Sequence, residues 1–586
     1  MKENTIKPMQ LLKELLKPYK GLLLKGFASL LIVNMADIIP PICLKLAIDS
    51  FNNPETARPT LFYCSITIVF IAILQSVFRF YWRQFFQGTS QHAIYDLRKQ
   101  LFDHLLKLPF DYFKRTRTGD IMSRMTNDIQ EIKFMLGMGI LIFLDALFYL
   151  STVPFIMVYL SPKLTAATLI PFTLITVFAT LAKTVIHKRS REIQSRLSDL
   201  SSRAEENLSG IRVIKGFGTE QEEINRFDAC GKEFVKVKLK LADFEAFFHP
   251  AINLLVGIGM ILLLYIGGNM VIEKTVTLGV FMAFQGYMLK LNWPMRAIGM
   301  IISSYQRGKA SLERCILILK EEKENTGESE HTGFAPRNFD LEAISASYKY
   351  PDGNEEAVKN ISFKLLQGET LGITGPVGCG KTTLLRLIMK IQNLTSGKIL
   401  VGGADIARVN TERLRNIFSY VPQEVFLFSE SVKENILFSA ENKNDPKQAL
   451  AYAALAGLKG ELEKFPHGIE TMLGERGVNL SGGQKQRISI ARALQAQRPI
   501  LVLDDCTSAV DTETEKEILD SLNKNGKKTK IIVSHRMVSI QNADRIIYMD
   551  NGEIVEMGKH DELMKLNGRY AAAWQRQRLK EKLETK

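Results

Sequence analysis

The sequence predicts a membrane all-α domain, with six transmembrane helices and long cytoplasmic extensions, followed by an α/β domain built around a phosphate-binding loop. Before about Ser304 the chain of 586 residues carries several apolar runs, and a helix needs about 20 such residues to cross a bilayer. Beyond about Lys320 it has the composition of a water-soluble α/β domain and contains a complete GxxxxGK[ST] motif. We place the membrane domain at residues 1–319, a polar linker at 320–338 and the α/β domain at 339–586.

Six apolar segments are expected to span the membrane: Gly21–Leu46, Leu61–Phe86, Met135–Leu160, Leu164–Ile186, Phe248–Ile272 and Leu278–Ser303. The joins after the first, third and fifth segments are short, whereas those after the second and fourth are long and basic. Because basic loops stay on the cytoplasmic side, this pattern predicts a multi-pass protein of the cell membrane with both termini in the cytoplasm.

The two long joins continue as helices. Residues 91–98 keep apolar side chains three and four positions apart, which is the spacing of an amphipathic helix. The tips of the projecting arms are expected at Leu108–Ile121 and Gly216–Phe227. At the first tip Phe110, Tyr112 and Phe113 suggest docking against another domain, the alternative being a locally packed turn.

Charged residues inside the predicted spans mark a candidate substrate cavity: Asp37, Arg79, Asp145, Lys290 and Arg296. Intramembrane charges are costly and usually face a bundle interior or a water-filled cavity. An equally open alternative is that Arg79 reaches the interface while the others pair structurally. Five prolines are expected to kink or end helices, as suits a cavity that opens and closes: Pro40, Pro41, Pro154, Pro171 and Pro294.

The net charge of +14 has two readings, a nucleic-acid partner or cytoplasmic loops rich in Lys and Arg. The basic residues flank apolar spans and no RNA-binding aromatic motif is present, so we expect no nucleic acid as a partner. None of the six cysteines forms a CxxC pair, which disfavours a zinc or redox site and favours free thiols.

The phosphate-binding loop lies between a predicted strand, Thr370–Thr374, and a predicted helix, Thr383–Ile391. Its glycines let backbone N–H groups curl around phosphates, Lys381 reaches the β- and γ-oxygens, and the Thr382 hydroxyl binds Mg²⁺. We therefore expect ATP and Mg²⁺ as cofactors, with these residues at the nucleotide: Gly375, Pro376, Val377, Gly378, Cys379, Gly380, Lys381, Thr382 and Thr383. Asp504, at the end of the apolar strand 501–504, suits the carboxylate that holds Mg²⁺.

The order of this loop, Gln423, the Leu-Ser-Gly-Gly-Gln run at 480–484, Asp504 and His535 resembles the ABC transporter superfamily. The six-span half ahead of it resembles that of an ABC exporter half-transporter, so the likeness covers essentially the whole chain. It implies that Tyr350 stacks on adenine, Gln423 contacts Mg²⁺ and senses the γ-phosphate, and His535 acts as the switch histidine. The signature residues are implied to hold ATP in trans: Ser481, Gly482, Gly483 and Gln484. Residues 508–511 match a loop that contacts the opposite subunit, and 474–477 match an exporter segment that contacts the helix tips.

The resemblance also implies a mechanism. Two ATPs lie between two such domains, each held by one chain's phosphate loop and the other chain's signature. Closure turns an inward-open cavity outward, and hydrolysis resets it. With one phosphate loop and six spans, the chain is expected to pair with a second half-transporter within membrane lipids.

Asp505 departs from the family pattern, which has a glutamate as general base directly after the magnesium aspartate. Its carboxylate lies about 1.5 Å closer to the backbone. A misplacement of about 1 Å costs roughly 100-fold in rate, so we expect this chain's own ATP site to be slow. An intact signature beside a weakened base favours one half of a heterodimer with one degenerate site. A homodimer in which Asp505 still works is the alternative.

The implied activity is ATP-driven export of small hydrophobic or amphipathic compounds, of the multidrug type. A lipid flippase on the same architecture is an alternative, and turnover stimulated by drugs or by lipids separates the two. A non-transporting regulator and a peptide exporter with a protease domain are disfavoured, since we expect neither an added regulatory domain nor room for a protease before the first span. Aromatic residues in the spans suggest bulky substrates: Phe143, Phe148, Phe281 and Phe284.

Overall fold

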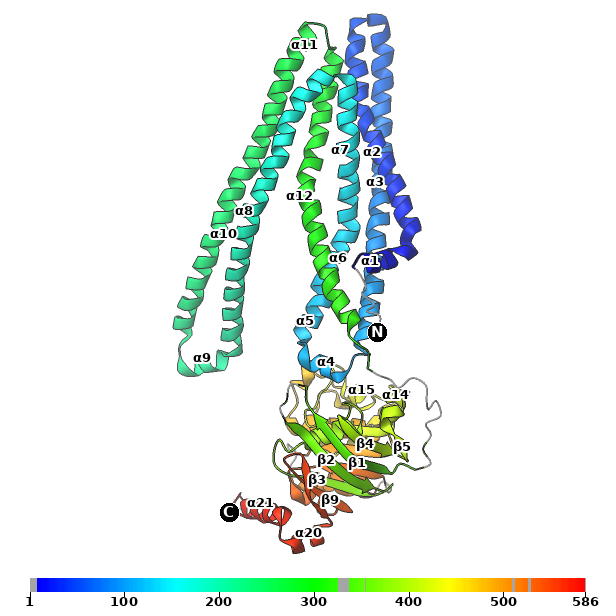
Figure 1. The fold of residues 1–586 in the computed structure, drawn as a ribbon, viewed down its shortest axis with the longest axis vertical. Helices are drawn as coiled ribbons and strands as arrows, with labels where there is room; N and C mark the ends of the chain where they lie inside the picture. The colour runs from blue at the N-terminus through cyan, green and yellow to red at the C-terminus, as the bar shows by residue number, and fades with distance from the viewer. Residues whose placement is uncertain are drawn as a thin grey trace. The chain divides into compact units, whose positions relative to one another are not determined.

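The computed structural model describes residues 8–324, 336, 338–351, 353, 355–507, 512–524 and 528–584. The chain divides into two compact units. Unit 1 comprises residues 1–108 and 116–322, and unit 2 comprises residues 109–115 and 323–586. Each unit is described by itself (Figure 1).

Unit 1 is helical. In chain order its helices are α1 (Pro8–Leu16), η1 (Lys17–Tyr19), α2 (Lys20–Asp49), η2 (Ser50–Asn52), α3 (Pro54–Leu105), α5 (Thr118–Ser123), η3 (Arg124–Asp128), α6 (Ile129–Phe134), η4 (Met135–Gly139), α7 (Ile140–Leu160), α8 (Pro162–Ser209), α9 (Ile211–Phe217), α10 (Glu220–Leu262), η5 (Leu263–Gly267), α11 (Gly268–Ile272) and α12 (Leu278–Lys320). Three of the short segments, η3, η4 and η5, are π-helical turns inside otherwise continuous helices, a feature frequent at functional sites.

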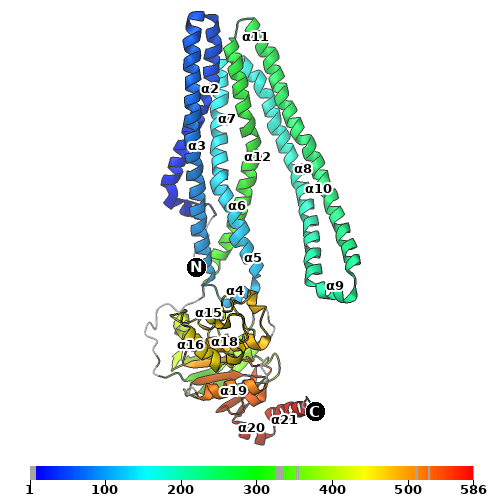
Figure 2. The same cartoon turned by 180° about the vertical axis from the view of Figure 1, so that it is seen from behind.

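Two groups of helices form unit 1. The helix α12 packs against α7 and α2, and α2 packs along α3. The helices α8 and α10 lie side by side and diverge from α7 and α12 toward their tip, α9 (Figures 1 and 2). The apolar core where the two groups meet includes Phe284, Tyr287 and Leu164, all fully buried. The tip α9 has no buried residue, and Phe217 is 80% exposed there.

Four helical stretches of the described chain are long and apolar enough to cross a membrane: Pro8–Asp49, Glu55–Leu105, Thr118–Leu160 and Glu220–Ile272. They contain the first, second, third and fifth predicted spans. The fourth and sixth predicted segments are helical within α8 and α12 but are not among these stretches, so the number six stays a prediction.

One tip differs from expectation, whereas the prolines leave one alternative open. The five predicted prolines lie inside α2, α7, α8 or α12, so none ends a helix, and a kink at each stays a prediction. The second tip lies earlier than predicted, because Gly218 takes the left-handed conformation (φ 66°) that ends α9, and residues 220–227 already form the first turns of α10.

Unit 2 contains two sheets. The four-stranded sheet has the order β2-β1-β4-β5 and is antiparallel, and the six-stranded sheet has the order β10-β9-β3-β8-β7-β6, with β9, β3, β8, β7 and β6 parallel. The strands are β1 (Leu341–Lys349), β2 (Glu356–Leu365), β3 (Thr370–Thr374), β4 (Ser396–Val401), β5 (Ala404–Asp405), β6 (Phe418–Val421), β7 (Ile500–Asp504), β8 (Thr529–Val533), β9 (Arg545–Asp550) and β10 (Glu553–Gly558).

The helices of unit 2 are α4 (Phe110–Arg115), α13 (Lys381–Ile388), η6 (Ile406–Arg408), α14 (Thr411–Arg415), α15 (Val432–Ile436), α16 (Pro446–Leu455), α17 (Lys459–Leu462), η7 (Gly468–Glu470), η8 (Glu475–Gly477), α18 (Gly482–Gln495), α19 (Thr512–Lys524), η9 (Met537–Ser539), α20 (His560–Leu566) and α21 (Arg569–Glu584). Among them α15, α16 and α18 pack together as a helical subdomain (Figure 2).

The central strand β7 is buried on both faces, as expected for a parallel sheet. Its residues alternate between two cores. Ile500 and Val502 pack with α13 and the smaller sheet, whereas Leu501 and Leu503 pack with the helical subdomain. The strand Thr370–Thr374 is confirmed to the residue. The helix after the phosphate loop begins at Lys381 rather than Thr383.

Candidate functional site

Four turns of unit 2 meet at one edge of the six-stranded sheet, the edge at which the parallel strands end. The phosphate loop follows β3, Gln423 follows β6, Asp504 ends β7 and His535 follows β8. Ile373 and Asp504 both pair with Val533, so β3, β8 and β7 end beside one another. Ligands of open parallel sheets bind outside the carboxyl ends of the strands, so this edge is the candidate site.

The backbone of the phosphate loop requires glycine at two places. Gly375 and Gly380 have φ angles of 147° and 100°. A Cβ atom on Gly375 would lie 2.1 Å from the Met549 oxygen, and one on Gly380 would lie 2.3 Å from the Ala357 oxygen. Neither position has room for a side chain. The loop is thereby packed against β9 and β2 while its amides turn toward its concave side.

The side chain of Lys381 folds back over this loop. Its Nζ donates hydrogen bonds to the carbonyl oxygens of Gly375 and Pro376, at 2.9 and 2.7 Å. The opposite side of the loop is open, since Val377 is exposed at the tip. The ammonium group is therefore held at the mouth of the loop, where a polyphosphate would neutralise it.

The carboxylate of Asp504 is buried and hydrogen-bonded on both oxygens. Thr382 Oγ1 donates to Oδ1 at 3.1 Å, and the Tyr420 hydroxyl donates to Oδ2 at 3.4 Å. Burial raises the pKa of Asp504, while these two hydrogen bonds act in the opposite direction. Burial also raises the pKa of Tyr420, so its hydroxyl stays a donor at neutral pH.

Sequence reasoning missed Tyr420. It lies on β6, three residues before Gln423, and reaches Asp504 because β6 and β7 are adjacent parallel strands. The signal that would have found it is the apolar run 417–421 with one tyrosine in it, which predicts a buried strand beside the aspartate strand. The side chain of Gln423 is exposed at the same edge.

The donors at this edge fit Mg²⁺ and a nucleotide. A threonine hydroxyl, a carboxylate and an amide oxygen are hard oxygen ligands of the kind Mg²⁺ prefers, and it takes few of them from the protein when phosphates supply the rest. Thr382 and Asp504 are already in contact, and Gln423 follows the adjacent strand.

Asp505 and His535 face each other across the ends of β7 and β8. Asp505 has a φ of 46° and its side chain is 8% exposed. Its carboxylate Oδ1 accepts a hydrogen bond from the His535 backbone N–H at 3.4 Å. The side chain of His535 is exposed, yet partial desolvation and the Lys381 charge lower the pKa of its imidazole, which favours the neutral ring at pH 7.

The signature residues belong to the helical subdomain rather than to the sheet edge. Ser481 caps α18, with Gln484 N–H donating to Ser481 Oγ at 3.3 Å and Ser481 N–H donating to Gln484 Oε1 at 2.9 Å. This reciprocal pair is a capping box, which satisfies the Ser481 and Gln484 N–H groups and leaves those of Gly482 and Gly483 without an acceptor within the helix. Ser481 and Gly482 are exposed, so the signature faces solvent.

Tyr350 is contacted by the short helix α4, from the first predicted tip. The ring of Tyr350 lies 4.8 Å from Lys114 Nζ, and its hydroxyl is 2.9 Å from Thr383 Oγ1. The Phe110 ring lies 5.5 Å from the Arg386 guanidinium, and Tyr112 is buried. The prediction that this aromatic tip docks against another domain is confirmed, because α4 clusters with unit 2.

Four of the five predicted intramembrane charges line one cavity of about 880 Å³ within unit 1: Asp37, Arg79, Asp145 and Lys290. The fifth, Arg296, has a side chain outside the described residues. Aromatic residues of the lining are Trp82, Phe134, Tyr149 and Trp293. The four aromatics named from the sequence are not in this lining: Phe284 is fully buried, Phe148 and Phe281 pack in a helical core, and Phe143 lies elsewhere.

Asp37 is the centre of this polar cluster. It accepts hydrogen bonds from Lys290, from the Tyr149 hydroxyl at 2.8 Å and from Gln75 at 3.1 Å, with Arg79 at 3.9 Å. These contacts join α2, α3, α7 and α12. Asp145 accepts instead from Asn34 at 3.0 Å. Charges that line the cavity therefore also pair with each other, and their role toward a substrate stays a prediction.

Two expected features lie outside the described residues. The loop at 508–511 is one, and the side chain of Arg476 in the segment 474–477 is the other. All six cysteines are free, as predicted.

Comparison with known proteins gives two family matches. The ABC transporter transmembrane region matches residues 23–295, and the ABC transporter model matches residues 358–508. A similar relative is the Bacillus subtilis probable multidrug resistance ABC transporter ATP-binding/permease protein YheI, 37% identical over 94% of each chain. The Escherichia coli multidrug resistance-like ATP-binding protein MdlA is 33% identical over 96% of this chain and 95% of its own length.

An ATP-dependent lipid A-core flippase of Desulfotalea psychrophila is 33% identical over 86% of this chain and 88% of its own length. Among solved structures, a bacterial Atm1-family ABC exporter with ATP bound has a TM-score of 0.77, covering 95% of this chain and 99% of that chain. At 23% identity this last likeness concerns the fold alone.

Proposed function

The chain belongs to the ABC transporter family, as a transmembrane region fused to an ATP-binding domain that drives export, and we propose that it is one half of a heterodimer with one degenerate ATP site. The observation that carries this proposal is Asp505 in place of a glutamate base, beside a complete signature. The short side chain is also tied by the hydrogen bond from His535 N–H, which draws the carboxylate toward β8.

The exposed signature supports the pairing. Ser481 at the start of α18 is solvent-exposed, and its capping box fixes the first turn of the helix. A helix N-terminus with free N–H groups binds phosphate. In the proposed complex, Ser481 through Gln484 serve the ATP held by the partner's phosphate loop, where a glutamate completes an active site.

The tip α9 also supports a partner. Val213 and Phe217 are exposed on a seven-residue helix that has no buried residue. Exposure of these apolar side chains to water, at the end of a 48-residue helix, is unfavourable unless another surface covers them. In the proposed complex the second half-transporter covers them.

Within the chain's own ATP site the residues have separate roles. Lys381 neutralises the β- and γ-phosphates, Thr382 and Asp504 hold Mg²⁺ with Gln423, and Tyr350 stacks on adenine. Mg²⁺–ATP supplies the phosphoanhydride whose binding and hydrolysis drive the transport cycle. Asp505 and His535 complete the site, with Asp505 a slow general base.

The proposed substrates are hydrophobic or amphipathic compounds of the multidrug type. The cavity around Asp37 supports this, since its wall combines Trp82 and Trp293 with charges of both signs. We place the chain in the cytoplasmic membrane with both termini in the cytoplasm, on the distribution of basic loops. A lipid flippase is the second candidate, favoured by the relative that carries that name.

Native mass spectrometry tests the pairing. The affinity-tagged chain is purified from its own host in mild detergent, and a one-to-one complex with a different exporter half is expected. A homodimer that hydrolyses ATP would overturn both the heterodimer and the degenerate site. Stimulation of ATP turnover by drugs, against stimulation by lipids, separates the exporter from the flippase.

A further inference from the structure

A second pocket of unit 2 lies at the opposite edge of the sheet from the ATP site. Its floor is a row of register partners near the starts of three parallel strands: Ser419 of β6, Leu501 of β7 and Lys530 of β8. Partners in adjacent parallel strands share one face of the sheet. This is the face that Leu501 presents to the helical subdomain.

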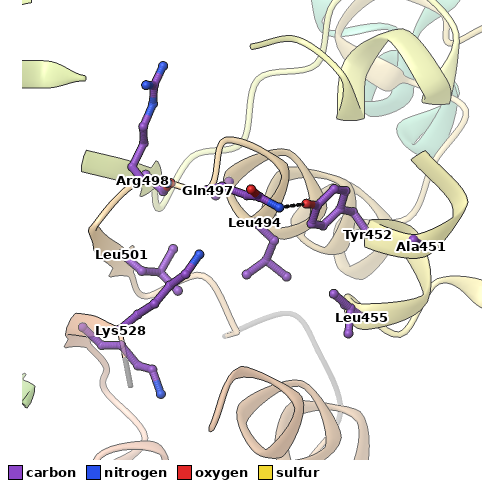
Figure 3. Close-up of a pocket in the computed structure, with 11 residues that line it drawn as sticks. Ala451, Tyr452, Leu455, Leu494, Gln497, Arg498, Leu501 and Lys528 are labelled. Carbon is purple, nitrogen blue, oxygen red and sulfur yellow. Dashed lines mark hydrogen bonds between the residues drawn. The ribbon is translucent and has the colours of Figure 1, made fainter. Parts of the chain in front are cut away.

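The walls come from the helical subdomain. Ala451, Tyr452 and Leu455 of α16 form one wall, and Leu494 near the end of α18 lies between them and Leu501 (Figure 3). The Tyr452 hydroxyl accepts a hydrogen bond from Gln497 Nε2, which fixes both side chains at the rim (Figure 3). The volume of the pocket is about 500 Å³, within the range of pockets for small organic ligands.

The backbone after α18 is held in an unusual conformation at this pocket. Gln497 has a φ of 49°, a left-handed backbone conformation that residues other than glycine seldom adopt. It directs the next residue toward the sheet, where the Arg498 N–H donates to Ser419 Oγ at 3.3 Å. The side chain of Arg498 extends away from Tyr452 and Leu494 (Figure 3).

The charge of the pocket has one sign. Its lining, all in the described part of the chain, holds Arg498, Lys528 and Lys530 and no carboxylate. Lys530 is 5% exposed, and burial lowers the pKa of its ammonium, which the charge of Asp544 partly offsets. The remaining wall, with Leu455, Leu494 and Leu501, suits an apolar body.

We propose that this pocket binds a small organic anion, with its phosphate or carboxylate beside Lys528 and Lys530 and its apolar part against Leu494 and Leu455. The site goes beyond ATP-driven export, since the catalytic edge of the sheet lies at the other end of the same strands. Neither the phosphate loop nor the signature contributes a residue to it.

Calorimetric titration of the full-length protein in lipid nanodiscs tests the proposal, with empty nanodiscs as the blank. A saturating non-hydrolysable ATP analogue with Mg²⁺ keeps the phosphate loop occupied. Phenyl phosphate or benzoate is expected to bind with one site per chain, and comparison of the two identifies the preferred anion. Phenol and benzylamine, which match the ring without the negative charge, are expected to bind at least about tenfold more weakly, a difference of about 1.4 kcal/mol.

Two variants locate the binding. Lys528→Gln is expected to weaken the anion about tenfold, again about 1.4 kcal/mol. Ala451→Trp, on the exposed side of α16, is expected to abolish binding by filling the pocket. Lys464→Gln is the matched control, an exposed lysine between α17 and η7 that is outside the lining. Unchanged binding of the ATP analogue shows that each variant is folded.

Three results would overturn the site. They are no binding of either anion above the blank, equal binding of phenol, and anion binding that survives both Lys528→Gln and Ala451→Trp.

Discussion

Asp505 combines a short side chain with a left-handed backbone conformation. Its φ of 46° is tolerated by aspartate better than by most residues, because the carboxylate is small and forms local hydrogen bonds. The Asp505 N–H donates to the Val533 oxygen at 2.8 Å, which anchors the turn to β8. The position of the carboxylate is thereby set by the sheet, and a longer side chain is the direct way to move it outward.

Asp505→Glu is expected to raise ATP hydrolysis at this chain's own site by up to about 100-fold, since roughly that factor is lost when a reacting group is displaced by about 1 Å. Single-turnover release of phosphate from the purified complex measures it. Asp505→Asn, which removes the base without changing the length, is the control and should stay slow. A rate unchanged by the glutamate would show that reach is not the defect.

The raised pKa of Asp504 predicts that its charge destabilises the nucleotide-free protein at neutral pH. Its folded-state pKa is raised by burial, so between the unfolded and the folded pKa the folded protein binds more protons and its stability falls as pH rises. Above the folded pKa the full cost is present. Asp504→Asn is expected to raise the melting temperature of the nucleotide-free protein at pH 7 and to remove this slope.

With Mg²⁺–ATP added, the unaltered protein is expected to melt at a higher temperature than the Asp504→Asn variant, because the carboxylate then has a cation beside it. Melting curves from pH 4 to 8, with and without nucleotide, measure both effects. A lower melting temperature for the nucleotide-free asparagine variant at pH 7 would contradict the argument.

The residues of the ATP site could be predicted because each is part of a local motif. The glycines, Lys381 and Thr382 lie within eight consecutive positions, and Asp504 follows an apolar run. Tyr420 could not be predicted in the same way, because its role depends on which strand lies beside β7. Strand order is a tertiary property, since β6 and β7 are adjacent in the sheet but about 80 residues apart in the chain.

At the scale of elements, α12 is tied to the helix beside it through Arg314. Its Nε donates to Asp128 Oδ2 at 2.8 Å, and its Nη2 contacts Oδ1, while Ser311 donates to Oδ1 at 3.0 Å. Asp128 is buried in the π-helical turn η3, where its carboxylate has little access to water. This is a fully hydrogen-bonded charge at a helix–helix contact.

Arg314→Ala is expected to destabilise unit 1 by about 1–3 kcal/mol, because it leaves a buried carboxylate short of donors. Arg307→Ala is the matched control on the same helix, since Arg307 Nε pairs with Glu131 at 2.9 Å but both side chains are largely exposed. Its effect should be below about 1 kcal/mol. Melting in detergent compares the two, and equal effects would show that burial of Asp128 is not what matters.

The sequence predicts the first tip correctly, whereas the second tip lies at earlier residues than predicted. Phe110, Tyr112 and Phe113 gave a sequence signal for docking because aromatic residues are rare on an exposed turn. The second tip depends on Gly218, one of several glycines in that region, and only its backbone conformation distinguishes it. The prolines fell inside helices because apolar helices tolerate the lost hydrogen bond where neighbours pack around it.

At the scale of the molecule, the sequence pattern predicts the two-part organisation, whereas the cavity depends on how the helices pack. The two-part organisation follows from composition alone, since long apolar runs stop near residue 304. The charged residues of the cavity are spread over more than 250 positions of the sequence. They come together because α2, α3, α7 and α12 pack against one another. Periodicity could not select the aromatic lining, because phenylalanine is common on every face of a membrane helix.

The cavity gives the last prediction, on substrate charge. Lys290→Met removes a positive charge that pairs with Asp37, so the lining becomes more negative. At an effective dielectric constant of about 20, one unit charge about 8–16 Å away contributes about 1–2 kcal/mol, or roughly tenfold in affinity. A cationic rhodamine ester should therefore stimulate ATP turnover at roughly tenfold lower concentration, relative to the parent zwitterionic acid of the same ring system.

Asp145→Asn, which removes a negative charge from the same wall, should shift the preference the other way. Half-maximal concentrations for both dyes in the reconstituted complex measure the two shifts. Shifts of the same sign in both variants would mean that the variants act through the fold of the helices and not through the charge of the cavity.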